Sequence, residues 1–399
     1  MPGKTDLEIS LRRGVRKLAE PVRQLRTLID MYRARRQQAR YVGRAIGITG
    51  SVGKTTATDL TRRLLQADHS VVFSDGRNIG RDAIGALLKL KGPVDFIVQE
   101  ISALPAREYH AALKAIELDV GVVTRVGLDH QSLFRTEDAV AREKGRLVEN
   151  VRAGGIVCLN ADDDRCRAMA ARSRARVVLY GQAMDAEIRA EAVDATWPNR
   201  MSFDLVIGGV RRRVQTSLVG TIFLPSVLAA LSVVHGLGLD LDAALSRLAS
   251  IEPVPWRLSV VEGHASGHTF VLDTFKASFW STQALIDDLK NWGSSRRVFV
   301  LGDMSDIRND ESRRYRQTLR RLAENADLVI GAGARGSSAA RKVALDNVAP
   351  AGTVREVAGL LAAQPGSLVI LKGNKSFPLD AVAGHPSHRL APRGSAFRL

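Results

Sequence analysis

The sequence predicts an α/β protein with a central phosphate-loop ATPase domain on a parallel sheet and a Rossmann-like C-terminal α/β domain, preceded by short basic helices. Two observations support this prediction. Short apolar runs alternate with amphipathic segments, which is typical of parallel strands covered by helices on both faces. A glycine-rich segment also joins one such strand to the helix that follows it. The chain has 399 residues, enough for two to three domains.

The predicted elements follow one another along the chain. Strands are expected at residues 45–49, 70–74, 96–100, 120–124 and 155–160, with helices at 55–66, 106–116 and 136–151. Within residues 178–216, shorter and more antiparallel strands are predicted at 189–197, 200–207 and 211–216, and helices follow at 224–237 and 243–250. A second α/β unit is predicted from strands at 269–272, 297–301, 328–331 and 368–371. We therefore expect a basic helical segment at 1–43, a central domain at 44–252 and a C-terminal domain at 253–399, with Pro253 and Pro255 at the last boundary.

Positive charge is concentrated at the N-terminus. The net charge is +16, and residues 1–44 carry twelve Lys or Arg side chains against four carboxylates. Apolar residues, among them Leu25, Leu28, Ile29 and Tyr32, recur here at helical spacing, and Pro21 is expected to divide the segment into two helices. Such a helix either packs its apolar stripe on the next domain or lies on an anionic membrane or polyanion. Nucleic acid is the least favoured partner, because aromatic residues make up only 5% of the chain.

Composition also restricts the class of protein. No apolar run has the length of a membrane span, and the N-terminus lacks the apolar core of a secretory signal. We expect a cytoplasmic protein, with association at the inner membrane face as an alternative. The two cysteines, Cys158 and Cys166, have no companions at ligand spacing, so neither a disulfide framework nor a zinc site is expected.

A phosphate loop is the strongest motif. The segment comprises Gly50, Ser51, Val52, Gly53, Lys54, Thr55 and Thr56, directly between a predicted strand and a predicted helix. Glycines let backbone N–H groups turn toward a polyphosphate, and the helix N-terminus adds a favourable dipole. Lys54 would supply a point charge for the outer phosphates, and the Thr55 hydroxyl would bind Mg²⁺. The sequence thus predicts a nucleotide site.

Further candidates follow the strands that come next. Glu100 ends one predicted strand, and Asp129 and His130 lie in the loop after another. Ligands collect at the carboxyl ends of parallel strands, so Glu100 and His130 are candidates for metal or phosphate binding. Lys144 lies within a predicted helix, where a lysine is usually a solvated charge.

Taken together, these motifs resemble those of the Mur ligases, the ADP-forming ligases of peptidoglycan precursor synthesis. Folylpolyglutamate and cyanophycin synthetases are their relatives. The resemblance also rests on segments that occur in family order: 78–80, 159–163, 256–258, 273–277, 301–304 and 371–373. Within the family, the chain looks most like the member that adds D-alanyl-D-alanine.

The resemblance implies a role for each matching residue. It implies that Lys54 and Thr55 bind the phosphates of ATP, that Glu100 binds a first Mg²⁺ and that His130 helps to bind a second. Lys144 matches a lysine that is carbamylated in many members, which would make it an anionic metal ligand. Asn78 would face the nucleotide or substrate, and Arg257, Asp273 and Lys276 would contact ATP at the domain junction.

The implied reaction joins a carboxylate to an amine through an acyl phosphate and releases ADP and phosphate. In place of the family's N-terminal UDP-binding domain we expect here a basic, helical segment of about 43 residues, and therefore an acidic peptide, a polyglutamate-like chain or a cell-envelope precursor as substrate. The first alternative is a phosphate-loop ATPase or regulator that is not a ligase. The second is a module that binds polyanions or membranes.

Overall fold

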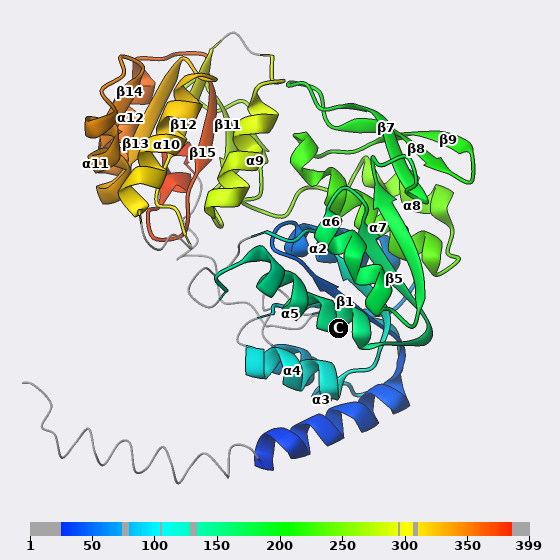
Figure 1. Ribbon diagram of the computed structural model, residues 1–399. Coiled ribbons are helices and arrows are strands. Elements are labelled where there is room, and N and C mark those ends of the chain that lie inside the picture. Colours follow the sequence, from blue (N-terminus) through cyan, green and yellow to red (C-terminus); the bar gives the residue numbers. More distant parts are fainter. Residues whose placement is uncertain are drawn as a thin grey trace, which may run out of the picture.

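The computed structural model describes residues 25–73, 80–103, 106–127, 134–293, 296–305 and 310–384. Asn78, Asp129, His130 and the predicted break at Pro21 lie outside these residues. The described residues form two sheets, one of nine strands and one of six. Figure 1 shows the larger sheet with its helices on one side of the molecule and the smaller sheet, in yellow to red, on the other. The mixed α/β class with parallel sheets is as predicted. The two boundaries between the three predicted segments stay a prediction.

The nine-stranded sheet has the order β2-β3-β1-β4-β5-β6-β7-β8-β9. Its strands are β1 (Val42–Thr49), β2 (Val71–Phe73), β3 (Val94–Glu100), β4 (Leu118–Val123), β5 (Val151–Asn160), β6 (Arg176–Gly181), β7 (Ile188–Asp194), β8 (Ser202–Ile207) and β9 (Val210–Gln215). Strand β1 lies between β3 and β4, parallel to both. This central position explains the apolar run of its second half, because both faces of the strand are covered.

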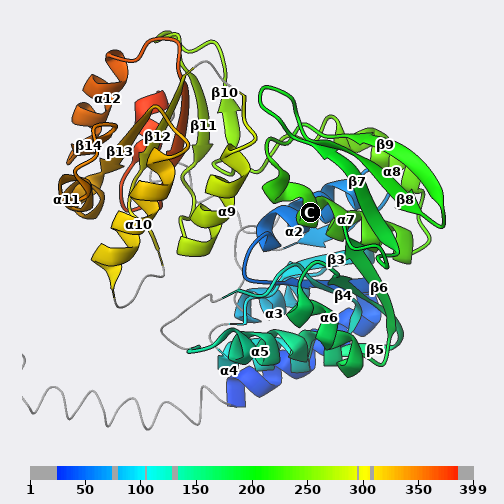
Figure 2. The ribbon, with the colours of Figure 1, turned by 45° about the horizontal axis from the view of Figure 1, so that its top comes forward.

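Helices cover both faces of this sheet (Figure 2). They are α2 (Lys54–Gln66), α3 (Gly80–Leu88), α4 (Ala106–Ala115), α5 (Glu137–Glu149), α6 (Asp164–Ala168), α7 (Leu224–Gly236) and α8 (Leu241–Leu248). Residues alternate along β1 between the two cores. Ile46 and Ile48 pack with side chains of α2 and α7, whereas Ala45 packs with side chains of α3, α4 and α5. The two-residue period of the strand therefore distributes its side chains between the two helical layers.

The three short strands predicted within residues 178–216 are confirmed as β7, β8 and β9. Strands β7, β8 and β9 do form antiparallel pairs. Strand β6 was not among the predicted strands; it pairs in parallel with β5 and with β7, and so extends the parallel part of the sheet. The short helix α6 and the 3₁₀ turn Met169–Arg172 form the crossover that brings β6 back in the same direction as β5.

The smaller sheet has the order β10-β11-β15-β12-β13-β14. Its strands are β10 (Ser259–Val261), β11 (Thr269–Asp273), β12 (Arg297–Leu301), β13 (Leu328–Ala332), β14 (Val348–Ala351) and β15 (Leu368–Lys372). Only β10 among them is antiparallel to its neighbour. The helices are α9 (Phe279–Leu289), α10 (Glu311–Ala323), α11 (Gly333–Val343) and α12 (Val354–Ala362). The registers of β11 and β15 place Asp273 opposite Lys372, at the carboxyl edge of the sheet.

Three polar or aromatic contacts join the parts of the chain that carry the two sheets. Trp197 stacks on Trp292 with 5.8 Å between ring centroids, and Arg200 forms a 2.9 Å ion pair with Glu262. The backbone N–H and the hydroxyl of Thr221 donate to Oδ1 of Asp288 at 2.9 and 2.6 Å. Burial raises the pKa of Asp288, although these hydrogen bonds oppose the rise. Helix α9 is thereby held against the loop that precedes α7.

Residues 25–41 form a helix, which we call the basic helix. It contacts the central domain through the buried Ala34 and through Gln38, whose amide donates to the carbonyl of Glu117 at 2.6 Å. The apolar stripe of Leu25, Leu28, Ile29 and Tyr32 is exposed. We predicted two arrangements for this stripe. The first, in which the stripe packs on the next domain, is therefore wrong for the described residues. Within the described residues, no helix combines the length and apolarity needed to span a bilayer.

Candidate active site

The phosphate loop leaves the carboxyl end of β1 and enters α2. Gly53 precedes the helix with a left-handed φ of 83°, and Gly50 has φ 151°. A Cβ atom on Gly50 would lie 1.9 Å from Oγ1 of Thr124. That hydroxyl is held in place because it donates to the carbonyl of Val52 at 2.6 Å. Glycine is therefore required at position 50 by both conformation and space.

Gly50→Ala is expected to lower the melting temperature and to weaken nucleotide binding at least tenfold, because the loop must move away from Thr124. The matched control is Gly85→Ala in α3, where a Cβ would meet no atom within 4 Å. This control is expected to keep nucleotide affinity and to stabilise the fold slightly, since alanine favours a helix over glycine. Thermal unfolding and titration with a fluorescent ATP analogue measure both effects. Unchanged nucleotide affinity in Gly50→Ala would contradict the account of the loop.

Two lysines converge on one carbonyl of this loop. Nζ of Lys54 donates to the carbonyl oxygen of Gly50 at 2.6 Å. Nζ of Lys144 donates to the same oxygen at 2.9 Å, from helix α5 on the other side of the loop. Lys144 is 2% exposed. The predicted phosphate lysine and the helical lysine are thus brought together although 90 positions separate them in the chain.

A cavity lies between the phosphate loop and the C-terminal sheet. From the central domain it is lined by Ser51, Val52, Gly53, Lys54, Thr55, Thr56, Glu100, Ile222, Phe223 and Ser226. From the segment after residue 252 it is lined by Arg257, Leu258, Asp273, Phe275, Lys276, Ser278, Ser281 and Lys372. The cavity therefore brings together every predicted site residue in the described part of the chain except Gly50 and Lys144, which lie just behind it at the loop.

Glu100 and Arg257 face the cavity from its two sides. Glu100 ends β3 beside Ile48 of β1 and is 6% exposed. Burial lowers the pKa of the Arg257 guanidinium, and the charges of Asp273 and Glu100 oppose this change. The arginine also lies over the ring of Phe275, 4.5 Å from its centroid. A guanidinium that lines the cavity and packs over an aromatic ring is well placed to bind a phosphate group.

The C-terminal side contains a buried ion pair. Lys372, at the end of β15, donates to the Asp273 carboxylate and, at 3.1 Å, to the carbonyl of Lys276. The pKa of the Lys372 ammonium lies below its usual value, because burial lowers it by more than the Asp273 carboxylate raises it. Lys375 lies over Phe275 at 4.1 Å from the ring centroid. Phe275 is therefore flanked by two cations at the edge of the cavity.

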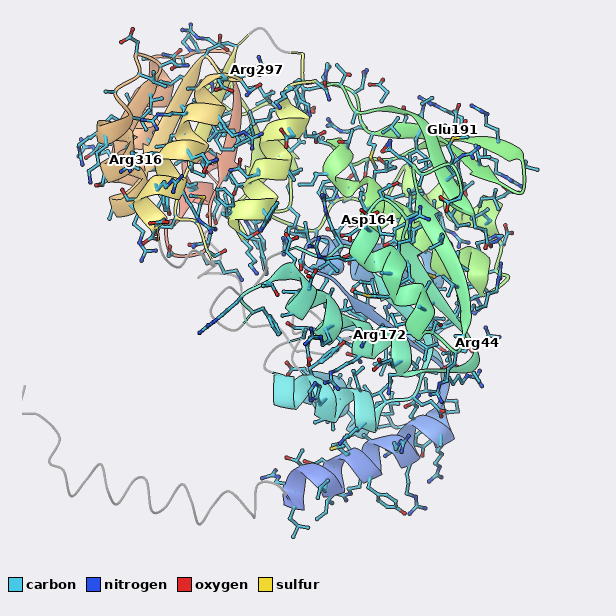
Figure 3. The ribbon with its side chains drawn as sticks, in the orientation of Figure 1. Arg44, Asp164, Arg172, Glu191, Arg297 and Arg316 are labelled. Atoms are coloured by element: carbon cyan, nitrogen blue, oxygen red, sulfur yellow. The ribbon has the colours of Figure 1, made fainter. Side chains whose placement is uncertain are left out.

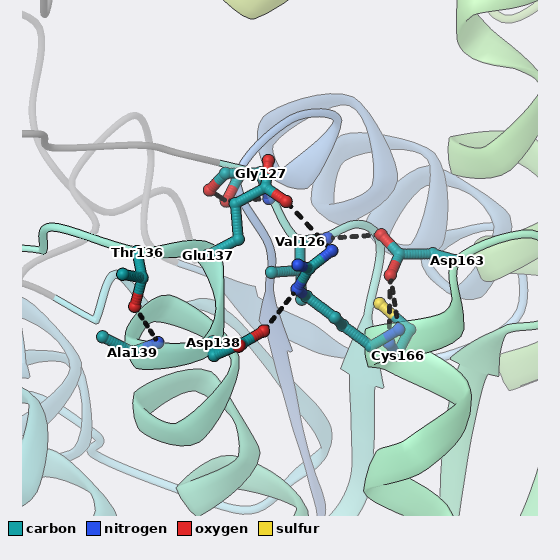
Figure 4. A network of polar contacts seen from close by, with 10 residues as sticks. Val126, Gly127, Thr136, Glu137, Asp138, Ala139, Asp163 and Cys166 are labelled. Carbon is teal, nitrogen blue, oxygen red and sulfur yellow. Dashed lines mark hydrogen bonds and ion pairs between the residues drawn. The ribbon is translucent and has the colours of Figure 1, made fainter.

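A polar network holds the segment that follows β4 (Figure 4). The Ser51 hydroxyl donates to the carbonyl of Gly127 at 2.9 Å, and the N–H of Gly127 donates back at 3.0 Å. The N–H of Val126 donates to Asp163, which also caps α6. Arg165 extends the network by ion pairs with Glu137 at 2.9 Å and Asp138 at 2.8 Å. Residues 125–127 are thereby fixed against the phosphate loop.

Sequence reasoning missed several residues of the site. Lys372 belongs to a segment that supports the resemblance, but no role was predicted for it. Its signal was a lysine at the end of an apolar strand, opposite another strand that ends in aspartate. Thr124 and Ser226 contact the phosphate loop through hydroxyl groups, and Phe275 binds two cations. No sequence motif marks Thr124 or Ser226, because each acts through a partner distant in the chain, and Phe275 lies in the segment 273–277 but had no predicted role.

The residues present also fit a magnesium ion. The Thr55 hydroxyl and the Glu100 carboxylate line the same cavity, and oxygen ligands of these kinds are those that Mg²⁺ prefers. In the described part of the chain, no three His, Cys, Asp or Glu residues cluster as a metal site. Mg²⁺ in nucleotide sites is usually bound by one or two carboxylates together with phosphates and water.

The fold and the site define a two-domain phosphate-loop enzyme that uses ATP. The family model described as "Mur ligase middle domain" matches residues 48–234, and the model described as "Mur ligase, glutamate ligase domain" matches residues 256–375. The chain belongs to the Mur ligase family. It is accordingly an ATP-dependent amide ligase of the acid–amino-acid type.

Three relatives illustrate the similarity. The UDP-N-acetylmuramoyl-tripeptide–D-alanyl-D-alanine ligase of Mycobacterium tuberculosis is 27% identical over 85% of this chain and 72% of its own length. The MurF ligase of Thermotoga maritima, solved in complex with ADP, has a TM-score of 0.78 at 22% identity and covers 89% of this chain and 82% of its own. The Mycobacterium tuberculosis folylpolyglutamate synthase, complexed with ADP and AMPPCP, has a TM-score of 0.67 at 18% identity, with coverages of 87% and 92%. The last two similarities concern the fold.

Proposed function

We propose that this ligase activates a carboxylate of an acidic substrate as an acyl phosphate and then joins it to an amine, releasing ADP and phosphate. The observation that carries the proposal is the cavity between the two sheets. It places Lys54 and Thr55 of the phosphate loop opposite Arg257 and Lys276. A polyphosphate bound there would contact cationic groups from both domains.

In the first step, a carboxylate oxygen of the substrate attacks the γ-phosphorus of ATP. The bond between this phosphorus and the β,γ-bridging oxygen breaks, and ADP leaves. Lys54, from the loop, and Arg257, from the opposite side, are proposed to stabilise the charge that spreads over the phosphoryl oxygens. Mg²⁺ bound by Thr55 and Glu100 would supply further neutralisation when present.

In the second step, the amine nitrogen attacks the acyl carbon. The bond from this carbon to the phosphate oxygen breaks, an amide forms, and phosphate leaves while the amine loses its proton to solvent or base. Water would hydrolyse the acyl phosphate, so the reaction needs a site that excludes it. The apolar walls contributed by both domains, Phe223 from the central domain and Leu258 and Phe275 from the C-terminal domain, support this exclusion.

An anionic form of Lys144 is part of the proposal. Two ammonium groups that donate to the single carbonyl of Gly50 repel each other in a buried environment. Carbamylation of Lys144 would replace one of these cations by an anion and remove the repulsion. The anion would lie beside the phosphate loop, where it is suited to hold a second Mg²⁺. The predicted contribution of His130 to that ion stays a prediction, because this residue lies outside the described part of the chain.

The acidic nature of the substrate is inferred from charge. The net charge of +16 is large, and the described cavity contains four cationic side chains, Lys54, Arg257, Lys276 and Lys372, against two carboxylates. An acidic peptide, a polyglutamate-like chain or an anionic envelope precursor would be attracted to such a site.

The test is ADP release measured over a panel of carboxylates and amines, which includes acidic peptides, oligoglutamates and UDP-muramoyl peptides. We expect release to require both an acid and an amine, and to be fastest with an acidic acceptor that is not linked to UDP. Release that depends on neither partner would identify an ATPase or regulator instead. A response restricted to UDP-muramoyl peptides would overturn the proposed substrate class.

A further inference from the structure

The outer side of the basic helix combines exposed apolar groups with positive charge. Leu25, Leu28, Ile29 and Tyr32 are 60%, 61%, 47% and 64% exposed. Four other large apolar side chains are similarly exposed in the described part of the chain, Met184, Val210, Trp280 and Leu345, and each comes from a different segment. Single exposed apolar residues are ordinary on a protein surface, whereas a cluster marks an interaction site.

Helical geometry places this cluster on the side that faces away from the protein. The spacings of three and four residues between Leu25, Leu28 and Ile29, and between Ile29 and Tyr32, bring these side chains onto one side. The buried Ala34 and the docked Gln38 occupy the opposite side. Figure 1 shows the helix, in blue, along the edge of the central domain farthest from the C-terminal sheet. The exposed row is therefore not part of the contact with the central domain.

Three arginines lie beside this row, on the flank of the basic helix next to α3, where they line a cavity together with Leu88. Arg33, Arg36 and Arg40 are exposed and lie three or four residues apart, next to Ile29 and Tyr32. No ion pair joins them to any other described residue, and Asp30 is the single carboxylate within residues 25–41. By contrast, two arginines of strand β9 form ion pairs: Arg211 with Glu191 at 2.6 Å and Arg212 with Asp242 at 2.7 Å. Glu191 is labelled in Figure 3.

We infer that the outer side of the basic helix docks on an anionic phospholipid bilayer. An amphipathic helix at a bilayer surface buries its apolar side at the boundary between headgroups and acyl chains, while its cations meet anionic headgroups. A polyanion would neutralise the arginines but leave the apolar row in water. A second copy paired through this side would bring arginines against arginines, because the same patch meets itself in a two-fold contact.

Docking in this way leaves the ligase site accessible. The cavity with Lys54 and Arg257 lies between the two sheets, whereas the basic helix lies beyond α3 and α4 at the far edge of the central domain (Figures 1 and 2). The enzyme would thus be held at a bilayer with its active site turned toward the aqueous phase. The inference is independent of the proposed substrate.

Vesicle flotation tests the inference with the full-length chain. Vesicles of phosphatidylcholine alone are compared with vesicles of equal parts phosphatidylcholine and phosphatidylglycerol, at low and at physiological salt. One variant removes apolar groups, Leu28→Gln with Ile29→Gln. A second removes charge, Arg33→Gln with Arg36→Gln and Arg40→Gln. Matched controls on other surfaces are Met184→Gln with Leu345→Gln, and Arg313→Gln with Arg320→Gln and Arg341→Gln.

The parent is expected to float with the anionic vesicles and not with the neutral ones. Each helix variant is expected to bind at least tenfold more weakly, while both controls bind as the parent does and all variants keep ATP turnover. Failure of the parent to float, or flotation that neither helix variant weakens, would overturn the inference. So would sedimentation showing a dimer that both helix variants dissociate, because the outer side would then pair two copies.

Discussion

Lys54→Ala is expected to reduce ATP turnover by at least two orders of magnitude. The lysine extends from the first turn of α2, and its ammonium donates to the carbonyl of Gly50, so it is held at the phosphate loop. Charge that develops on the transferred phosphoryl group has to be stabilised by groups already in place, and removal of one such group from an active site costs about 10²–10³ in rate. ADP release with the best acid and amine pair measures the effect.

The control for this prediction is Lys342→Ala, which removes an exposed lysine from the last turn of α11. It is expected to turn over ATP as the parent does. Both variants are expected to unfold at temperatures near that of the parent, because Lys54 borders a solvent-accessible cavity and does not belong to a hydrophobic core. Turnover near the parental value in Lys54→Ala would show that the loop does not bind the reacting phosphates.

Lys144→Ala is expected to lower turnover by about a hundredfold, and a small carboxylic acid or bicarbonate is expected to restore part of it. The side chain is nearly inaccessible and its Nζ meets the loop at Gly50. A truncated side chain leaves space beside the loop, where a small carboxylate can replace the anionic end of a carbamylated lysine. Turnover is measured against added formate, acetate and bicarbonate, with mass spectrometry of the parent for the carbamate.

Two further variants separate the carbamate from a purely structural role. Lys144→Arg keeps a cation but cannot be carbamylated, so it is expected to be as impaired as Lys144→Ala and to resist rescue. Lys114→Ala, at an exposed position of α4, is expected to behave as the parent. Parental turnover in Lys144→Arg would reject the carbamate and leave Lys144 as a cation that supports the loop.

Sequence patterns predicted those parts of the fold that are encoded locally. Strands β1, β3 and β4 were predicted because both faces of each strand are buried, which produces a continuous apolar run. Strand β6 was not predicted, and its direction depends on the crossover through α6 and not on its own residues. The orientation of the basic helix was left open for a similar reason: both of its sides carry apolar residues, and periodicity alone does not show which side packs.

In the site, too, the residues that are contiguous in the chain could be predicted, and those that are distant in the chain could not. The phosphate loop is contiguous, so its motif was visible in the chain. The bond from Lys144 to Gly50 and the pair between Lys372 and Asp273 join residues that lie 94 and 99 positions apart. Only the order and pairing of the strands bring such residues together, and no spacing in the sequence specifies them. The resemblance to a family named Lys144, but its position at the loop came from the fold.

The central claim is that the carboxylate takes the γ-phosphoryl group of ATP before the amine attacks. The most direct test supplies the acids of the panel with ¹⁸O in both carboxylate oxygens and measures the label in the released phosphate by mass spectrometry. We expect one ¹⁸O atom in each phosphate formed together with amide, because one carboxylate oxygen leaves on the phosphorus. Unlabelled phosphate formed together with amide would contradict the claim, since the bond between acyl carbon and oxygen would then have been broken without phosphoryl transfer to the acid.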